Sequence, residues 1–466
     1  MKLVYGVSDK PSWGKTVIFA LQQLLAIMAA TIVVPVIING ATGSELSQSG
    51  ALFGAGVGTL VYLLFTKFKS PVFLGSSFAF LGSMIAAFAG AATMAIGYLG
   101  LIIGAVFAGL VYVILALLVK KFGVGWINKL MPPVVIGPTV AIIGLSLAGN
   151  AVGDLMTGNA DPLASGATVY VALACGLLTL FVTIACSVFG KKMVKMIPFI
   201  IGIGAGYALA AIFTAISYAG DTPELLALRI IDFGKFNTDW SKWYPDFTFL
   251  KAFTGDLSGF NGSYIVTILA AYVPVAFVVF AEHIADHKIL SSIIEHDLLQ
   301  DPGLHRTLLG DGVGSMAGAF FGGACNTTYG ESIGCVAISG NASVRTIFMT
   351  ACMAIVLSFI LPFSILLSTI PSCVMGGVCI ALYGFIAVSG LKMIKEVDLG
   401  DNRNLFVVSV ILICGVGGMA ISFGANGEVT LTAVATALIL GILTNVLVHL
   451  RDNKAEEKPA EDKQAE

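Results

Sequence analysis

Charge is scarce in this chain, and its scarcity excludes most classes of soluble protein. Only 11% of the 466 residues are Asp, Glu, Lys or Arg, whereas 57% are hydrophobic. Soluble domains lack that composition, which is typical of chains with many apolar stretches of about 20 residues, the length that crosses a bilayer. The 25 basic residues form no stripe and are balanced by 27 acidic residues, so binding to nucleic acid is not expected.

Cysteine pairs with metal-binding or redox spacing are also missing. The eight cysteines are scattered through apolar stretches, and none belongs to a C-x-x-C pair. Each is expected to be a small buried hydrophobic residue, so neither a metal site nor a cofactor is predicted. No convincing signal-peptide cleavage site is present, and the first apolar run, about 16–38, is too long for a signal core. It is expected to remain as the first membrane span.

About fourteen apolar segments predict an all-α polytopic membrane protein that contacts the lipid bilayer throughout. Lysine and arginine fit an even number of spans in the cytoplasmic (inner) membrane, with both termini in the cytoplasm. The remaining bases fall in one long external loop, about 218–259, and long loops are exempt from the positive-inside rule. The charged tail, 451–466, lacks a core pattern and is expected to be disordered.

Two short patterns recur about half a chain apart. Pro132-Pro-Val-Val-Ile-Gly137 and Pro371-Ser-Cys-Val-Met-Gly376 each open a span, although chance explains this match about as well as a repeat does. Stretches rich in Gly, Ser and Thr interrupt the third span at Leu74–Phe80 and the tenth at Asn326–Ser332. Paired interrupted spans in two inverted halves are the best sequence indication of a transporter's binding site.

Two glutamates stand where a membrane chain should carry no charge. Glu282 lies within a long apolar run, and Glu331 lies in the interrupted tenth span. Ionisable groups at membrane depth are costly, so they usually face a cavity and act there. The β-branched stretch before Glu331 favours extended backbone, and a half-helix after it would point free N–H groups into the bundle. The alternative role for Glu331 is to cap or join two helices.

Asp286 follows Glu282 by four residues, so the two side chains share a helix face. Two carboxylates this close repel each other when both are ionised, so one is expected to hold a proton, as in a proton relay. His283 and His287 lie on other faces, and we expect them at a membrane interface near the end of the span. Asp311 is a further acid near membrane depth and is assigned no role.

Three segments resemble the uracil permease branch of the nucleobase–ascorbate transporter family. They are Ala281-Glu-His-Ile-Ala-Asp286, Asp301-Pro-Gly-Leu-His-Arg306 and Asn326-Thr-Thr-Tyr-Gly-Glu331, and Gly75-Ser-Ser-Phe-Ala-Phe80 also matches. The segment from Asn326 to Glu331 is specific to this branch. The similarity extends from the N-terminus to about residue 450.

The resemblance implies a seven-plus-seven inverted repeat with short β-strands in the interrupted spans 3 and 10. It also implies a core domain and a gate domain, with homodimers formed through the gate. In this chain the core comprises 1–122 (spans 1–4) and 259–368 (spans 8–11), and the gate comprises 123–258 (spans 5–7 and the external loop) and 369–450 (spans 12–14).

The resemblance further implies a nucleobase site between the two strands, with proton symport by alternating access. Two acids would hold the base through its N–H and carbonyl edges, two aromatic rings would pack beside it, and a backbone N–H and the first span would complete the wall. Carried over to this chain, these residues are Glu282, Glu331, Phe78, Tyr329, Gly330 and Ala30. Proton coupling would fall to Glu282 and Asp286.

Three positions depart from the family's pattern. Gln23 stands where the family has histidine, and Ser332 stands where asparagine follows the glutamate. Asp286 replaces a histidine that some members carry, so the group beside Glu282 is a second carboxyl rather than an imidazole.

We therefore expect a symporter that imports uracil with protons and is not an enzyme. Two carboxylates suit a ligand edge with two N–H groups, and a cytosine-like edge would leave a buried acceptor unpaired at a cost of about 1–3 kcal/mol. Thymine and 5-substituted uracils present the same edge as uracil. The alternatives are a xanthine or purine permease of the same family and an anion carrier on the same architecture, which would need a basic residue or bare helix N-termini at its site.

Overall fold

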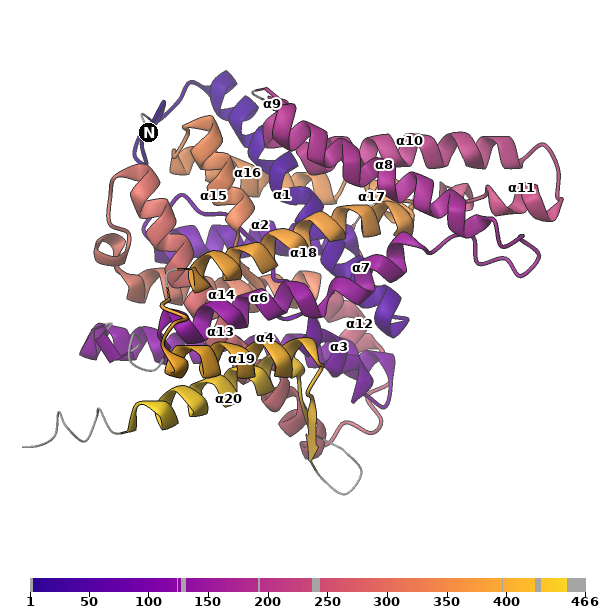
Figure 1. Ribbon diagram of the computed structural model, residues 1–466. Helices are drawn as coiled ribbons and strands as arrows, with labels where there is room; N and C mark the ends of the chain where they lie inside the picture. Colours follow the sequence, from indigo (N-terminus) through magenta and orange to yellow (C-terminus); the bar gives the residue numbers. More distant parts are fainter. Residues whose placement is uncertain are drawn as a thin grey trace, which may run out of the picture.

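The computed structural model describes residues 3–123, 125–126, 131–191, 193–236, 244–395, 397–423 and 429–450. The tail at 451–466, for which the sequence predicts disorder, lies outside these residues. Helices dominate the described chain (Figure 1).

The first part of the chain forms two long helices, an interrupted segment and a third long helix. These elements are α1 (Trp13–Thr42), α2 (Gln48–Phe65), strand β1 (Leu74–Ser76), the short α3 (Leu81–Ala89) and α4 (Met94–Phe122). The next helices are α6 (Pro133–Ser146), α7 (Ala148–Leu155), α8 (Thr168–Phe189), α9 (Met193–Met196) and α10 (Pro198–Ser217). Helices α8 and α10 pack side by side and extend away from the other helices (Figure 1).

The segment expected to be an external loop contains only short helices: α11 (Pro223–Ala227), the 3-10 helix η1 (Phe233–Phe236) and α12 (Thr248–Thr254). The elements that follow are α13 (Gly262–Ile294), the π-helix η2 (Leu299–Gly303), α14 (Leu304–Gly322), β2 (Asn326–Thr328), α15 (Gly330–Ser339), α16 (Val344–Ser358) and α17 (Leu361–Ser368). The chain ends with α18 (Ser372–Ile394), α19 (Asn402–Val416), β3 (Ile421–Phe423), β4 (Val429–Leu431) and α20 (Ala433–Val448).

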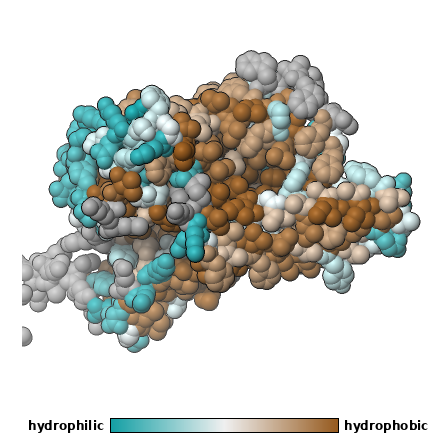
Figure 2. All heavy atoms as spheres, turned by 90° about the horizontal axis from the view of Figure 1, so that it is seen from above, coloured by the Kyte–Doolittle hydropathy of each residue, from teal (hydrophilic) through white to brown (hydrophobic). Residues whose placement is uncertain are grey.

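The lengths and composition of these helices confirm a multi-pass membrane protein. Within the described residues, eight helices are long and apolar enough to cross a bilayer, or nine if the bent pair α16–α17 is one span. Figure 2 shows hydrophobic residues over much of the visible face and hydrophilic residues gathered toward its margins. Such a surface suits hydrocarbon around the middle of the protein and water at its ends.

The two interrupted segments meet in the centre of the protein. Strands β1 and β2 pair antiparallel, with Leu74 opposite Thr328, Gly75 opposite Thr327 and Ser76 opposite Asn326. Each strand leads into a half-helix, α3 after β1 and α15 after β2, and these helices have only 9 and 10 residues. The pairing satisfies extended backbone that would otherwise be unpaired at membrane depth. It also brings together residues about 250 positions apart in the sequence.

Helices from the two halves of the chain approach closely at glycines. Helix α2 packs on α14, and a Cβ added to Gly54 would lie only 2.4 Å from the carbonyl oxygen of Gly318. One turn along, a Cβ on Gly58 would lie 2.8 Å from the carbonyl oxygen of Gly314. The residue numbers rise along α2 as they fall along α14, so the two helices run antiparallel.

Helices α6 and α18, which follow the repeated proline motif, also pack on each other. Pro132 and Pro371 each occupy the N-cap position directly before the helix. A Cβ on Gly137 would lie 3.1 Å from the backbone nitrogen of Ile394, whereas one on Gly144 would lie 2.3 Å from the carbonyl oxygen of Tyr383. This pair is therefore antiparallel as well.

Candidate functional site

A cavity of about 520 Å³ lies at the junction of the two strands. Residues from α1, α6, α10, α13, α15 and α18 surround it, together with the segments that link each strand to its half-helix. Its lining includes Ala26, Phe78, Glu282, Asp286, Thr328, Tyr329, Gly330 and Glu331. The cavity therefore gathers most of the site residues predicted from the sequence.

Three acidic side chains face this cavity from two helices. Glu282 and Asp286 lie one turn apart on α13, and Glu331 lies in the first turn of α15. The Asp286 carboxyl accepts a hydrogen bond from the Thr328 hydroxyl at 2.7 Å. The Glu282 carboxyl accepts no hydrogen bond from the side chain of another described residue, so its oxygens are available to a ligand in the cavity. Repulsion among three carboxyl groups in one cavity favours the binding of protons.

Two aromatic rings form part of the wall beside these acids. Tyr329 is held against β1, because its hydroxyl donates to the Ser76 carbonyl at 2.8 Å. A Cβ on Gly75 would lie 2.3 Å from the Tyr329 ring, so glycine is required where the ring crosses the strand. Phe78 is 8% exposed and packs edge-to-face on Tyr383 of α18 at 5.9 Å between centroids.

The remaining two predicted residues differ in their relation to the cavity. Gly330 is exposed and lines the cavity at the start of α15. Ala30 is 0% exposed and is not part of the lining; Ala26, one turn earlier on α1, forms that part of the wall. Glu282, Glu331, Phe78, Tyr329 and Gly330 are thus brought together, whereas Ala30 lies behind them.

Two of the three departures from the family's pattern contact each other. The Gln23 amide nitrogen donates to the Ser332 hydroxyl oxygen at 2.6 Å and to the Ser332 carbonyl at 3.3 Å. The same hydroxyl oxygen accepts the backbone N–H of Phe73 at 3.2 Å. Ser332 follows Glu331, so this buried contact fixes the first turn of α15 against α1 and the segment that enters β1.

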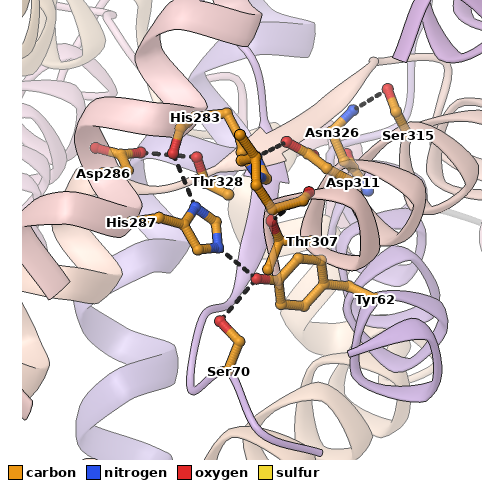
Figure 3. Close-up of polar contacts among 11 residues, drawn as sticks. Tyr62, Ser70, His283, Asp286, His287, Thr307, Asp311, Ser315, Asn326 and Thr328 are labelled. Atoms are coloured by element: carbon orange, nitrogen blue, oxygen red, sulfur yellow. Dashed lines mark hydrogen bonds and ion pairs between the residues drawn. The ribbon is translucent and has the colours of Figure 1, made fainter. Parts of the chain in front are cut away.

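The expectation that His283 and His287 lie at an interface is wrong. Both side chains are 0% exposed, because α13 continues to Ile294 and keeps these positions inside the protein. His283 contacts Asp311 of α14 at 2.6 Å, and Asp311 is itself 1% exposed (Figure 3). The sequence did carry a signal for this pair, since Asp311 stands between Gly310 and Gly312 in an otherwise small-residue stretch where a neighbouring helix can approach closely.

The cavity opens at the end where α18 terminates. Exposed Lys195 and Lys392 lie there, beyond Ser389. A second, polar cavity of about 790 Å³ lies at the other end of α18, near Ser372, and at the C-terminal end of α1, near Asn39. The two cavities thus lie toward opposite ends of α18, whereas α1 meets the first cavity at Ala26 in its middle.

Contacts from the long loop border the second cavity. The Lys235 ammonium donates to the Ser368 carbonyl at 2.6 Å, and Lys251 donates to the Glu45 carbonyl. These contacts join the loop to α17 and to the segment after α1 on the side away from the three acids.

Known proteins are similar to this chain over nearly its whole length. Residues 14–423 match the model of the permease family. A uracil permease of Bacillus caldolyticus is 39% identical, covering 98% of this chain and 97% of its own length. Uracil permeases of Bacillus subtilis (strain 168) and Escherichia coli (strain K12) are 38% and 36% identical, each covering 96% of this chain and 95% and 94% of their own lengths.

Two solved transporters share the fold at low sequence identity. The transmembrane domain of the cyanobacterial bicarbonate transporter BicA has a TM-score of 0.61 at 14% identity, covering 94% of this chain and 100% of that domain. The murine anion transporter Slc26a9, solved in an inward-facing state, has a TM-score of 0.63 at 12% identity, covering 96% of this chain and 69% of its own. These similarities support a transporter fold and carry no information on the substrate.

Proposed function

Because the chain belongs to the permease family, in its uracil permease branch, we propose that it imports uracil by proton symport across the cytoplasmic membrane. Membership in this family makes it a transporter rather than an enzyme. The observation that carries the substrate proposal is the convergence of Glu282, Asp286 and Glu331 on one cavity at the strand junction. Relatives with 36–39% identity over nearly the whole chain are uracil permeases.

Glu331 and Glu282 would accept hydrogen bonds from the two N–H groups of uracil. The free backbone N–H groups in the first turn of α15, beginning at Gly330, would donate to a uracil carbonyl, as helix N-termini do for other electron-rich groups. Phe78 and Tyr329 would pack beside the ring, with Ala30 supporting the α1 wall behind Ala26. The edge of uracil would then be paired throughout, as burial of a polar ligand requires.

Glu282 and Asp286 would carry the coupling proton. They share a face of α13 and both line the cavity. A proton from the bulk phase would therefore reach the two carboxyl groups through the cavity, without crossing a layer of packed side chains. Binding of a proton would relieve the repulsion among the three acids and favour the loaded carrier. Return of the proton to the cytoplasm would weaken the site and release uracil.

The architecture that we propose has fourteen spans in a seven-plus-seven inverted repeat. Elements that would correspond in such a repeat pack antiparallel on each other. The helix pairs α2 with α14 and α6 with α18 meet at glycines, and strands β1 and β2 pair through backbone hydrogen bonds. The core domain would comprise 1–122 and 259–368, and the gate would comprise 123–258 and 369–450. Both termini would be cytoplasmic, and homodimers would form through the gate.

The described conformation suits the inward-facing state of an alternating-access cycle. The cavity that holds the three acids opens beside Lys195 and Lys392, which the positive-inside rule assigns to the cytoplasm. Phe78 contacts Tyr383 at the junction of the proposed core and gate. Movement of the core against the gate would break this contact and expose the acids to the outer cavity.

An anion carrier is the function suggested by the fold alone, because both structural relatives transport anions. Three acids in the cavity oppose that function, since an anion placed among them would be repelled. A xanthine or purine permease remains the alternative within the family and is tested by competition.

Uptake of labelled uracil into proteoliposomes tests the proposal. An inward proton gradient should drive accumulation, and a protonophore should abolish it. Unlabelled uracil should compete, whereas xanthine should not. Uracil uptake that ignores the gradient would contradict symport, and competition by xanthine but not uracil would move the substrate to the purine class.

A further inference from the structure

His283, Thr307 and Asp311 form a buried polar group between α13 and α14 (Figure 3), and none of them is among the residues that line the cavity. His283 follows Glu282 in the chain, and its Nδ1 lies 2.6 Å from Oδ2 of Asp311 on α14. Its Nε2 lies 3.0 Å from the Thr307 hydroxyl oxygen. His283 and Thr307 are 0% exposed and Asp311 is 1% exposed, so water does not reach these contacts. The proposed uracil site does not use them.

The Thr307 hydroxyl has one hydrogen and two groups within hydrogen-bond distance, the Leu304 carbonyl at 3.0 Å and Nε2 of His283 at 3.0 Å. A carbonyl can only accept, so we assign the hydrogen to Leu304. With that assignment the hydroxyl accepts from His283, and Nε2 of His283 carries a hydrogen. A neutral imidazole with its hydrogen on Nε2 has a bare lone pair on Nδ1, which faces Asp311.

Two acceptors cannot face each other at 2.6 Å, so a proton must lie between Nδ1 and Oδ2. Either Asp311 is a neutral acid that donates to Nδ1, or His283 is an imidazolium beside a carboxylate. The other oxygen of Asp311, Oδ1, is buried and has no hydrogen-bond partner among the described residues. A carboxylate oxygen left unpaired in this way costs more than the carbonyl oxygen of a neutral acid, so the neutral pair is favoured.

The groups that surround the pair agree with a neutral state. The ring of Tyr112 packs edge-to-face on His283 from α4, and the ring of His287 stacks on it at 4.1 Å. His287 faces the Tyr62 hydroxyl of α2 at 2.7 Å, and the acids of α13 that line the cavity are Glu282 and Asp286. None of these neighbours is a lysine or arginine that could compensate an Asp311 carboxylate.

His287 extends the contact from α14 to α2. Its Nδ1 lies 2.8 Å from the His283 carbonyl, which can only accept, so Nδ1 is an N–H. Its Nε2 contacts the Tyr62 hydroxyl, which in turn contacts Ser70 at 2.7 Å. The turn of α13 that carries Glu282 is thereby joined to α14 through His283 and to α2 through His287.

We propose that Asp311 and His283 share one resident proton that stays bound throughout the transport cycle, and that this neutral pair positions Glu282. The role in positioning rests on the proposed function of Glu282. The pair would thus be separate from the acids that face the cavity. Protons that move with uracil would bind to those acids, and the proton between His283 and Asp311 would be a fixed part of the core.

The state of the pair can be measured without transport. In purified wild-type protein with ¹⁵N-labelled histidine, the His283 signals are assigned by their loss in His283→Gln. We expect a neutral ring with its hydrogen on Nε2, unchanged between about pH 5 and 8 and unchanged by uracil, whereas a free histidine titrates in this range. An imidazolium, a hydrogen on Nδ1 alone, or titration of His283 would overturn the proposal.

Substitutions at Asp311 test its separation from the coupling proton. In Asp311→Asn the amide can donate to Nδ1 as the neutral acid does, so we expect the ratio of protons to uracil to stay at the wild-type value. Asp311→Ala leaves Nδ1 unpaired and should weaken uracil binding about tenfold or more. A lower proton ratio in Asp311→Asn would show that this proton is transported. If Asp311→Asn does not fold, the ¹⁵N spectra of the wild-type protein still test the neutral state of the pair. Failure of uracil uptake by the wild type would contradict only the proposed function.

Discussion

The three acids of the cavity have different neighbours, and we expect them to act differently. Glu331 stands in the first turn of α15 beside free backbone N–H groups, so its position suits direct contact with a ligand. Glu282 and Asp286 share a face of α13, and Asp286 already accepts from Thr328. The pair on α13 is therefore better suited to bind a proton, while Glu331 selects the ligand.

Replacement of Glu331 by glutamine should reduce uracil binding about 100-fold, because an amide N–H would face a ligand N–H. Hydrogen bonds to charged groups contribute about 1.5–3 kcal/mol each. Isothermal titration calorimetry on purified protein measures the loss. The matched variant Glu282→Gln should keep more of the binding and lose the pH dependence of uptake. Near-normal proton-coupled transport in both variants would refute this division of roles.

The contact between Gln23 and Ser332 leads to a second prediction at the residue scale. Gln23 and Ser332 stand where the resemblance implies a histidine and an asparagine, and the two side chains are hydrogen-bonded to each other. We expect Gln23→His alone to weaken uracil binding several-fold, because the larger ring cannot reach the short serine with the same geometry. Adding Ser332→Asn should restore most of the affinity. Two losses that simply add in the double variant would show that the positions are independent.

Most of the site residues that the sequence predicted line the cavity, but the sequence did not predict the polar group formed by His283, Asp311 and His287. Glu282 and Glu331 could be recognised because charge is rare in apolar spans. His283 and His287 could not be placed, because the end of α13 at Ile294 is not marked by glycine or proline. Because no sequence signal marks the end of this helix, two histidines near a charged segment are predicted to lie at the membrane interface. The glycines beside Asp311 indicate close approach of another helix, but they do not say that α13 is that helix or that His283 is the residue that meets Asp311.

At the scale of elements, the site depends on two strands of three residues each. The sequence indicated the breaks through glycine, serine and threonine, and the structure shows that the breaks pair with each other. Ring packing makes this pairing specific, because Tyr329 crosses β1 at Gly75. The length of the half-helices and the register of the strands were not readable from local composition.

Gly75→Ala should displace the Tyr329 ring and reduce uracil binding at least about tenfold, because the added Cβ would lie 2.3 Å from that ring. The protein should still fold, since the ring can move toward the cavity. Gly82→Ala is the control, because the nearest atom to its Cβ would be 3.8 Å away on Thr432. Binding measured by titration should be normal in the control. Equal affinity in both variants would show that the ring is not part of the site.

At the scale of the whole molecule, the two cavities lie toward opposite ends of α18, as one state of the proposed cycle would require. The cavity with the acids reaches Lys195 and Lys392, and Phe78 in its lining packs on Tyr383. The general fold could be expected from the apolar spans and the two interrupted segments. The sequence could not predict which end of the cavity is open, because the two states of a carrier share one sequence and differ only in how the domains pack.

The direction of the opening can be tested with introduced cysteines. Ser389→Cys at the inner end of the cavity should react faster with a membrane-impermeant thiol reagent in inside-out vesicles than in right-side-out ones. Ser364→Cys, in the outer cavity, should show the opposite order. Mass spectrometry separates these sites from the eight native cysteines. Faster labelling of Ser389→Cys from the outside would reverse the orientation proposed here.

Equilibrium binding of labelled uracil to the purified protein tests the central claim most directly, because it asks whether the cavity with three acids recognises this base. We expect saturable binding that unlabelled uracil displaces, that xanthine leaves unchanged, and that Glu331→Gln loses. Undiminished binding in Glu331→Gln, or displacement by xanthine and not by uracil, would contradict it.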